Sequence, residues 1–135
     1  MKKEGNEEYL EFEKLEVWRR AVSFADMVID LTENLNIKRK HYRLIEQLEA
    51  ASTSISMNIA EGKGRNSTKE FVQFLYYSRG SLFEVATLLL IFRQRGWIGP
   101  DSHLKIKKEA IEISKMLVGL IKYLSEKRKK EKEKR

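Results

Sequence analysis

The sequence holds few side chains of the kinds that perform catalysis, and their spacing does not bring them together. It has no cysteine and two histidines, His41 and His103. A di-iron site in a helical bundle needs Glu-x-x-His pairs, whereas Lys38 and Pro100 stand three residues before the two histidines. The motifs HExxH, GxSxG and GxGxxG are absent as well. We therefore predict no catalytic residue, no metal ligand and no cofactor, and hence a protein that is not an enzyme.

Phosphate binding is the chemistry that the segment 61–68 (EGKGRNST) suggests. Two glycines, the basic residues Lys63 and Arg65, and a helix that begins directly afterwards could together hold an anion. The segment lacks the Walker spacing and no strand precedes it, which disfavours specific nucleotide binding. Two interpretations stay open: contact with a polyanion, and a plain turn between helices.

The elements that must position these residues are helices. Apolar residues recur every three or four positions in four stretches, 17–35, 41–59, 71–92 and 106–124. Four helices with short connections predict an all-α fold, an antiparallel up-down-up-down four-helix bundle. The expected organisation is a polar N-terminal lead-in, a four-helix bundle domain and a basic charged tail, at residues 1–12, 13–125 and 126–135.

Capping residues mark the expected ends of these helices. The second helix is expected to end in a left-handed cap at Gly62 or Gly64. Ser67 and Glu70 have the spacing of a capping box at the start of the third helix. Further signals are a helix stop at Gly96 and an N-cap at Asp101 or Ser102.

The third helix is more apolar than a lone bundle requires. Between Phe71 and Phe92, fifteen of 22 positions are apolar, whereas one packed face needs about three in seven. This excess predicts self-association into a homo-oligomer, or else a central helix contacted by the three others. The longest apolar run, residues 85–92, which includes Thr87, is far shorter than a membrane span. We expect no membrane partner and a cytoplasmic location.

Positive charge is concentrated at the C-terminus. The chain has 27 Lys and Arg against 20 Asp and Glu, a net charge of +7. Residues 126–135 contain seven basic and three acidic side chains, so they supply most of the excess. Such a tail attracts polyanions without reading their sequence; the alternative is a solvated helix end that keeps the protein soluble.

Polar residues near the junction of the second and third helices form a further constellation. Asn58 and Glu61 share one helical face beside the apolar stripe, and polar groups so close to a core need partners. One hypothesis is a network that fixes the register of the second and third helices. The other is a basic ligand surface. The residues concerned are Asn58, Glu61, Arg65, Arg79, Gly80 and Glu84.

The same segments resemble one protein family. The matching pieces are Asn58-Ile59-Ala60-Glu61-Gly62, Gly64-Arg65, Glu70-Phe71, Phe74-Leu75 and Gly80-Ser81-Leu82 with Glu84. The opening helix, through Phe12, Leu15, Val17-Trp18 and Ala21, is similar as well, and so are Tyr42, Leu44, Gln47-Leu48 and Ala51. The family comprises proteins encoded within intervening sequences of bacterial 23S ribosomal RNA genes, and it includes the accessory variability protein of diversity-generating retroelements.

This resemblance implies a bacterial four-helix bundle that assembles into a ring-like homopentamer with a basic surface. It implies no enzymatic activity, and it implies association with RNA. The retroelement members are similar proteins that bind a reverse transcriptase, which gives an alternative function as an accessory protein-interaction subunit.

The leading hypothesis is therefore a non-catalytic, oligomeric, RNA-binding bundle. Lys and Arg side chains would contact phosphates with an affinity that depends strongly on salt. The candidate nucleic-acid-binding residues are Lys63, Arg65, Arg79, Arg19, Arg20, Lys127, Arg128, Lys129 and Lys130. The structural motif residues are Asn58, Glu61, Gly62, Gly64, Gly80 and Glu84.

Overall fold

Four α-helices make up most of the chain. The structure, a computed structural model, describes residues 8–134. A short 3-10 helix, η1 (Glu11–Lys14), precedes α1 (Glu16–Glu33), and a second one, η2 (Arg39–His41), precedes α2 (Tyr42–Lys63). The remaining helices are α3 (Thr68–Gln94) and α4 (Pro100–Glu133), and no strand occurs in the part of the chain described. Most of the lead-in, residues 1–7, lies outside the described residues.

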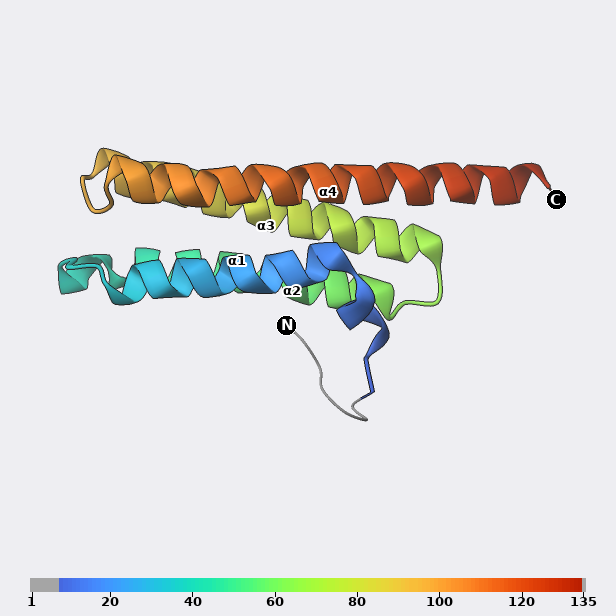
Figure 1. The fold of residues 1–135 in the computed structure, drawn as a ribbon, viewed down its shortest axis with the longest axis horizontal. Coiled ribbons are helices and arrows are strands. Elements are labelled where there is room, and N and C mark those ends of the chain that lie inside the picture. The colour runs from blue at the N-terminus through green and yellow to red at the C-terminus, as the bar shows by residue number, and fades with distance from the viewer. Residues whose placement is uncertain (1–7, 135) are drawn as a thin grey trace.

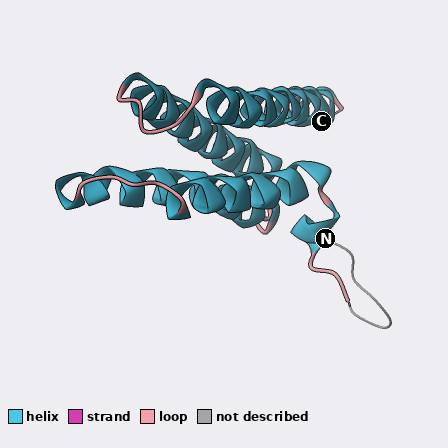
Figure 2. Ribbon diagram, turned by 60° about the vertical axis from the view of Figure 1, so that its left-hand side comes forward, coloured by secondary structure: helices cyan, strands magenta, loops and turns pink. Residues whose placement is uncertain are grey.

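The helices pack as an antiparallel bundle (Figures 1 and 2). Each helix contacts two others, in the order α1, α2, α3, α4 and back to α1. The all-α four-helix bundle that the apolar periodicity predicts is thus confirmed. Within residues 8–134, α3 lies against α2 and α4 and makes no comparable contact with α1, so the alternative of a central third helix is wrong.

The core is built from one apolar stripe on each helix. Phe24, Ile55, Leu75 and Ile113, one from each helix, are fully buried. Burial of a side chain of this kind is worth about 1.5–3 kcal/mol. The expected stripes hold almost throughout, but on α4 Ile121 is buried whereas the neighbouring Leu120 is only half-buried.

Two of the expected helix ends are confirmed. The Ser67 hydroxyl accepts a hydrogen bond from the Glu70 amide at 3.0 Å, which caps α3. Gly96 has φ +75°, and the amide of Trp97 donates to the Phe92 carbonyl at 2.9 Å, as in a Schellman motif.

Helix α2 ends at Gly64 as expected but without the left-handed cap, and the expected N-cap of α4 is wrong. Gly64 has a right-handed backbone with φ −76°, and Gly62 lies inside α2. A glycine at position 62 serves close packing rather than a left-handed cap. At the next junction α4 begins at Pro100, after Gly99, so neither Asp101 nor Ser102 is the N-cap. Proline is favoured in the first helical turn because its missing N–H would have no partner there.

By length and mean hydropathy, α3 is the one helix in residues 8–134 that could cross a membrane. The sequence interpretation considered only the longest apolar run and therefore did not identify α3 as such a helix. One third of its most apolar 18-residue stretch is buried inside the bundle. A helix that contributes to the core of a bundle meets the same criteria of length and hydropathy. The remaining apolar side chains of α3 lie on its outer surface.

Candidate nucleic-acid interface

Lys63 and Arg65 lie at the α2–α3 connection, on top of two aromatic rings. The Lys63 ammonium is 5.7 Å from the centroid of the Phe71 ring, and the Arg65 guanidinium is 4.8 Å from that of Phe74. Arg65 also donates to the Glu61 carboxylate at 2.7 Å. These contacts hold both cations at the surface at one end of the bundle.

The basic tail continues α4 as a helix that projects beyond the other three helices (Figure 1). Helix α4 has 34 residues, a length of roughly 51 Å, and it runs past the start of α3 (Figure 1). Its last turns lie beside the α2–α3 connection, where a shallow groove is lined by Asn66, Ser67, Thr68, Lys69, Arg128, Glu131 and Lys132. Arg128 is half-buried there, while Lys127, Lys129 and Lys130 are exposed.

The structure therefore places Arg128 and Lys132 of the tail beside Lys69 at the start of α3, with Lys63 and Arg65 on the connection that leads into α3. We call this surface the loop–tail surface and define it by Lys63, Arg65, Lys69, Arg128 and Lys132. The sequence interpretation did not include Lys69 and Lys132. Antiparallel pairing of α3 with α4 could have revealed them, because it places the first turn of α3 beside the last turns of α4. The amino end of α3 adds the partial positive charge of its helix dipole.

Arg79 does not join this surface. It lies on α3 more than two turns beyond Thr68, with its guanidinium 4.9 Å from the Phe83 ring centroid. Its Nε atom is shielded from solvent and has no hydrogen-bond partner among the described residues.

Arg19 and Arg20 are occupied by contacts within the chain. Arg19 donates to the Glu13 carbonyl at 2.8 Å. Arg20 makes two hydrogen bonds of 2.9 Å to the Glu109 carboxylate, which ties α1 to α4. The hydrogen bond and the charge of Glu109 raise the pKa of Arg20 above its ordinary value, so this guanidinium is held in an ion pair.

The motif residues divide into two kinds. At Gly62 the helices α2 and α3 approach closely: a Cβ atom there would lie 2.6 Å from the Cβ of Phe74. Gly80, in contrast, has open space around it. Asn58 donates to the Ser54 carbonyl of its own helix at 2.8 Å.

Serines, more than the expected polar network, link α2 to α3. Ser54 donates to the Ser81 hydroxyl at 2.5 Å, and the buried Ser78 donates to the Ile55 carbonyl at 2.8 Å. Of the residues expected to form the network, Glu84 makes a cross-helix bond, accepting from Gln47 at 3.0 Å. This pairing of hydroxyls across the two helices was not predicted from the sequence.

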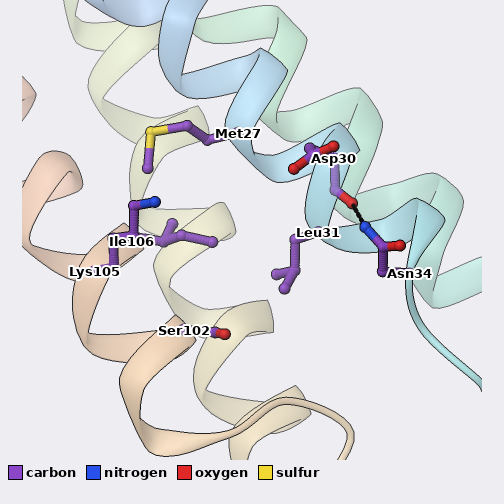
Figure 3. Close-up of a pocket in the computed structure, with 7 residues that line it drawn as sticks. All are labelled: Met27, Asp30, Leu31, Asn34, Ser102, Lys105 and Ile106. Atoms are coloured by element: carbon purple, nitrogen blue, oxygen red, sulfur yellow. Dashed lines mark hydrogen bonds between the residues drawn. The ribbon is translucent and has the colours of Figure 1, made fainter.

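A pocket lies between α1 and α4 (Figure 3). Its volume is about 280 Å³, and its polar lining comprises Asp30, Asn34, Ser102 and Lys105. Asn34 Nδ2 donates to the Asp30 carbonyl across its rim. Within residues 8–134 no group of three or more His, Cys, Asp or Glu side chains is placed to bind a metal ion.

Comparison with known proteins identifies the class to which this bundle belongs. Residues 13–119 match the family described as 23S rRNA-intervening sequence protein. The chain belongs to this family, since the match covers most of its length. No curated protein matches the chain.

A solved structure supports the fold. The chain is similar to a protein of unknown function from the S23 ribosomal protein family of Bacteroides thetaiotaomicron VPI-5482, with a TM-score of 0.73 and 24% sequence identity. The similarity covers 78% of this chain and 98% of the other. At this identity, the comparison supports the bundle architecture alone.

Proposed function

We propose that this protein is a non-catalytic, cytoplasmic, RNA-associated bundle that binds RNA through the loop–tail surface. One observation carries the proposal: Arg128 and Lys132 of α4 line one groove with residues 66–69, which directly follow Lys63 and Arg65 in the sequence. Membership of the intervening-sequence family favours RNA as the polyanion. The resemblance adds a homo-oligomer, a pentamer, in which several copies of this surface would act together.

Recognition on this surface is electrostatic. Lys and Arg side chains neutralise phosphates and release counterions, so the affinity falls steeply as salt rises. Contacts to phosphates position the protein but carry no sequence information. We therefore expect little discrimination between RNA sequences. The tail residues Lys127, Lys129 and Lys130 extend the charge along α4, while Arg79, Arg19 and Arg20 lie outside the proposed surface.

The test is a titration of labelled RNA at two salt concentrations with three double variants. K63A/R65A and R128A/K132A each remove two charges from the loop–tail surface, and we expect roughly tenfold weaker binding. The slope of log affinity against log salt should fall by about 1.5, because each lost phosphate contact contributes about 0.7–0.9.

The matched control is K105A/K108A, which removes two exposed charges from the opposite end of α4. It should change both quantities much less. Equal losses for all three variants would mean that binding follows net charge alone. Absence of binding by the native chain would overturn the proposal.

A second candidate function is that of an accessory subunit of a reverse transcriptase. The exposed apolar side chains on α3 and α4 favour it, because a partner protein could cover them. It predicts co-purification with a reverse transcriptase encoded beside this gene, with an affinity that is insensitive to K63A/R65A.

A further inference from the structure

Apolar side chains lie exposed along two adjacent helices. Tyr76, Phe83 and Leu90 follow one another at seven-residue spacing on α3, and Leu104, Ile111 and Val118 do so on α4. Each of these six side chains is between 45% and 52% exposed. We call this surface, with the groove between the two helices, the apolar face.

The two helices form one continuous surface at this face. A groove of about 300 Å³ between them is lined mainly by apolar groups, among them Ala86, Leu90 and Ala110. Seven-residue spacing keeps each set on one side of its helix. Monomeric proteins rarely expose contiguous apolar surface of this extent, so a partner is expected to cover it.

Arg79 points to a partner that carries carboxylates. It lies on α3 between Tyr76 and Phe83, and its Nε atom is desolvated without a hydrogen-bond partner among the described residues. A desolvated donor of a charged group is costly to leave unpaired. The buried Nε atom is out of reach of a partner, but the rest of this part-exposed guanidinium forms no ion pair with a described residue, so an acidic group on the covering surface would pair with its terminal nitrogens.

The opposite half of this same chain has the required charge. Helices α1 and α2 together carry seven acidic and four basic residues, whereas α3 and residues 100–125 of α4 carry five acidic and eight basic ones. The two pairs of helices therefore have equal and opposite net charge, although the α1–α2 connection adds the basic residues Lys38, Arg39 and Lys40 beside the first pair. Two apolar faces brought together would repel each other, while an apolar face set against α1 and α2 of another copy would be attracted.

Exposed residues of α1 and α2 define the complementary surface. Asp26 and Glu33 lie seven residues apart on α1, and Glu46 lies on the exposed side of α2. Met57, 65% exposed, adds an apolar contact on α2. We call this the acidic face. A standard interface buries about 800 Å² on each partner, a small share of the 9294 Å² of accessible surface of the chain.

We infer that the apolar face of one copy binds the acidic face of the next. Such a contact joins two different surfaces, so it repeats from copy to copy, and it closes into a ring where the rotation between neighbouring copies allows closure. The inference rests on the homo-oligomer in the proposed function and is independent of RNA binding.

The test is the mass in solution, by light scattering or sedimentation, of two variants alone and mixed. F83E/I111E places charges in the apolar face, and D26K/E46K reverses charges in the acidic face. All four positions are exposed or surface-facing on their helices, so circular dichroism should show an intact bundle. Each variant alone should be a monomer. A mixture of the two should form a 1:1 dimer, since each supplies one intact face.

E112K, a charge reversal on α4 outside both faces, is the matched control and should keep the native mass. A monomeric native protein would overturn both the inference and the homo-oligomer. If the native protein is an oligomer and D26K/E46K keeps its mass, the pairing of faces is wrong while the homo-oligomer stands. Titration of RNA against the monomeric variants tests the loop–tail surface separately.

Discussion

Gly62 is the residue at which side-chain size matters most for this fold. A Cβ atom there would meet the Phe74 Cβ at 2.6 Å and a ring carbon of Phe71 at 3.0 Å. The Phe74 Cβ is fixed to its backbone, so α2 and α3 would have to move apart.

We predict that G62A lowers the free energy of unfolding by about 1–3 kcal/mol, the usual cost of overpacking. Urea denaturation of the variant measures it. G119A is the control, because Gly119 is helical with open space around it. It should be neutral or stabilise by up to about 1 kcal/mol, as alanine favours helix over glycine. A G62A variant as stable as the native protein would show that the helices adjust freely.

At the scale of single residues, local roles could be predicted from the sequence better than contacts between distant residues could. Ser67 caps α3 as its spacing with Glu70 indicated. The partners of Arg20 and Ser78 could not be predicted, because Glu109 and the Ile55 carbonyl are distant in sequence and meet them only after the helices have packed. Gly62 was identified by its residue type, but the reason for a glycine there is a contact across the hairpin.

At the scale of the elements, apolar periodicity predicted the four helices, whereas the helix ends were predicted only in part. Heptad spacing reflects burial of one face, which the bundle imposes on every helix. Helix ends depend on local competition, and at the third junction Pro100 begins α4 ahead of the expected caps at Asp101 and Ser102. The extension of α4 through the charged tail shows that helix propensity continues where burial stops.

One contact between connections gives the bundle a pH dependence. His41, at the start of α2, packs against Trp97 of the α3–α4 connection with ring centroids 5.0 Å apart. Desolvation lowers the pKa of His41 below its ordinary value of 6.5, and the nearby charges of Lys40, Arg95 and Lys38 lower it further.

The unfolded chain therefore binds this proton at a higher pH than the folded chain does. The contribution of neutral His41 to stability is complete above the ordinary histidine pKa. It is lost as the pH falls from there through the lowered pKa of the folded chain. We predict a free energy of unfolding that decreases between pH 7.5 and 5.5. In H41Q this decrease should be smaller, as urea denaturation at several pH values can measure. An identical pH dependence in H41Q would contradict the assignment.

At the scale of the whole molecule, the chain separates a core that maintains the fold from surfaces that bind. The core takes one stripe from each helix, and Leu124 is the last buried residue of α4. The loop–tail surface lies at one end of the bundle and the apolar face along one side. Residues of both surfaces could be named from the sequence, but neither surface was predicted as a whole, because each joins segments that the antiparallel packing brings together.

This separation predicts that the tail is dispensable for folding. Residues 126–133 contain no buried side chain, so a chain that ends at residue 125 should unfold within about 1 kcal/mol of the full chain. It should keep the oligomeric state of the full chain in solution. Because it lacks Arg128 and Lys132, it should bind RNA more weakly.

A chain that ends at residue 120 is the control. It lacks the buried Ile121 and Leu124, and at roughly 1.5–3 kcal/mol for each it should lose about 3–6 kcal/mol. Thermal or urea unfolding measures both chains. If the chain that ends at residue 125 were markedly destabilised, the last turns of α4 would support the bundle. Its loss of RNA affinity would then report on folding rather than on a binding surface.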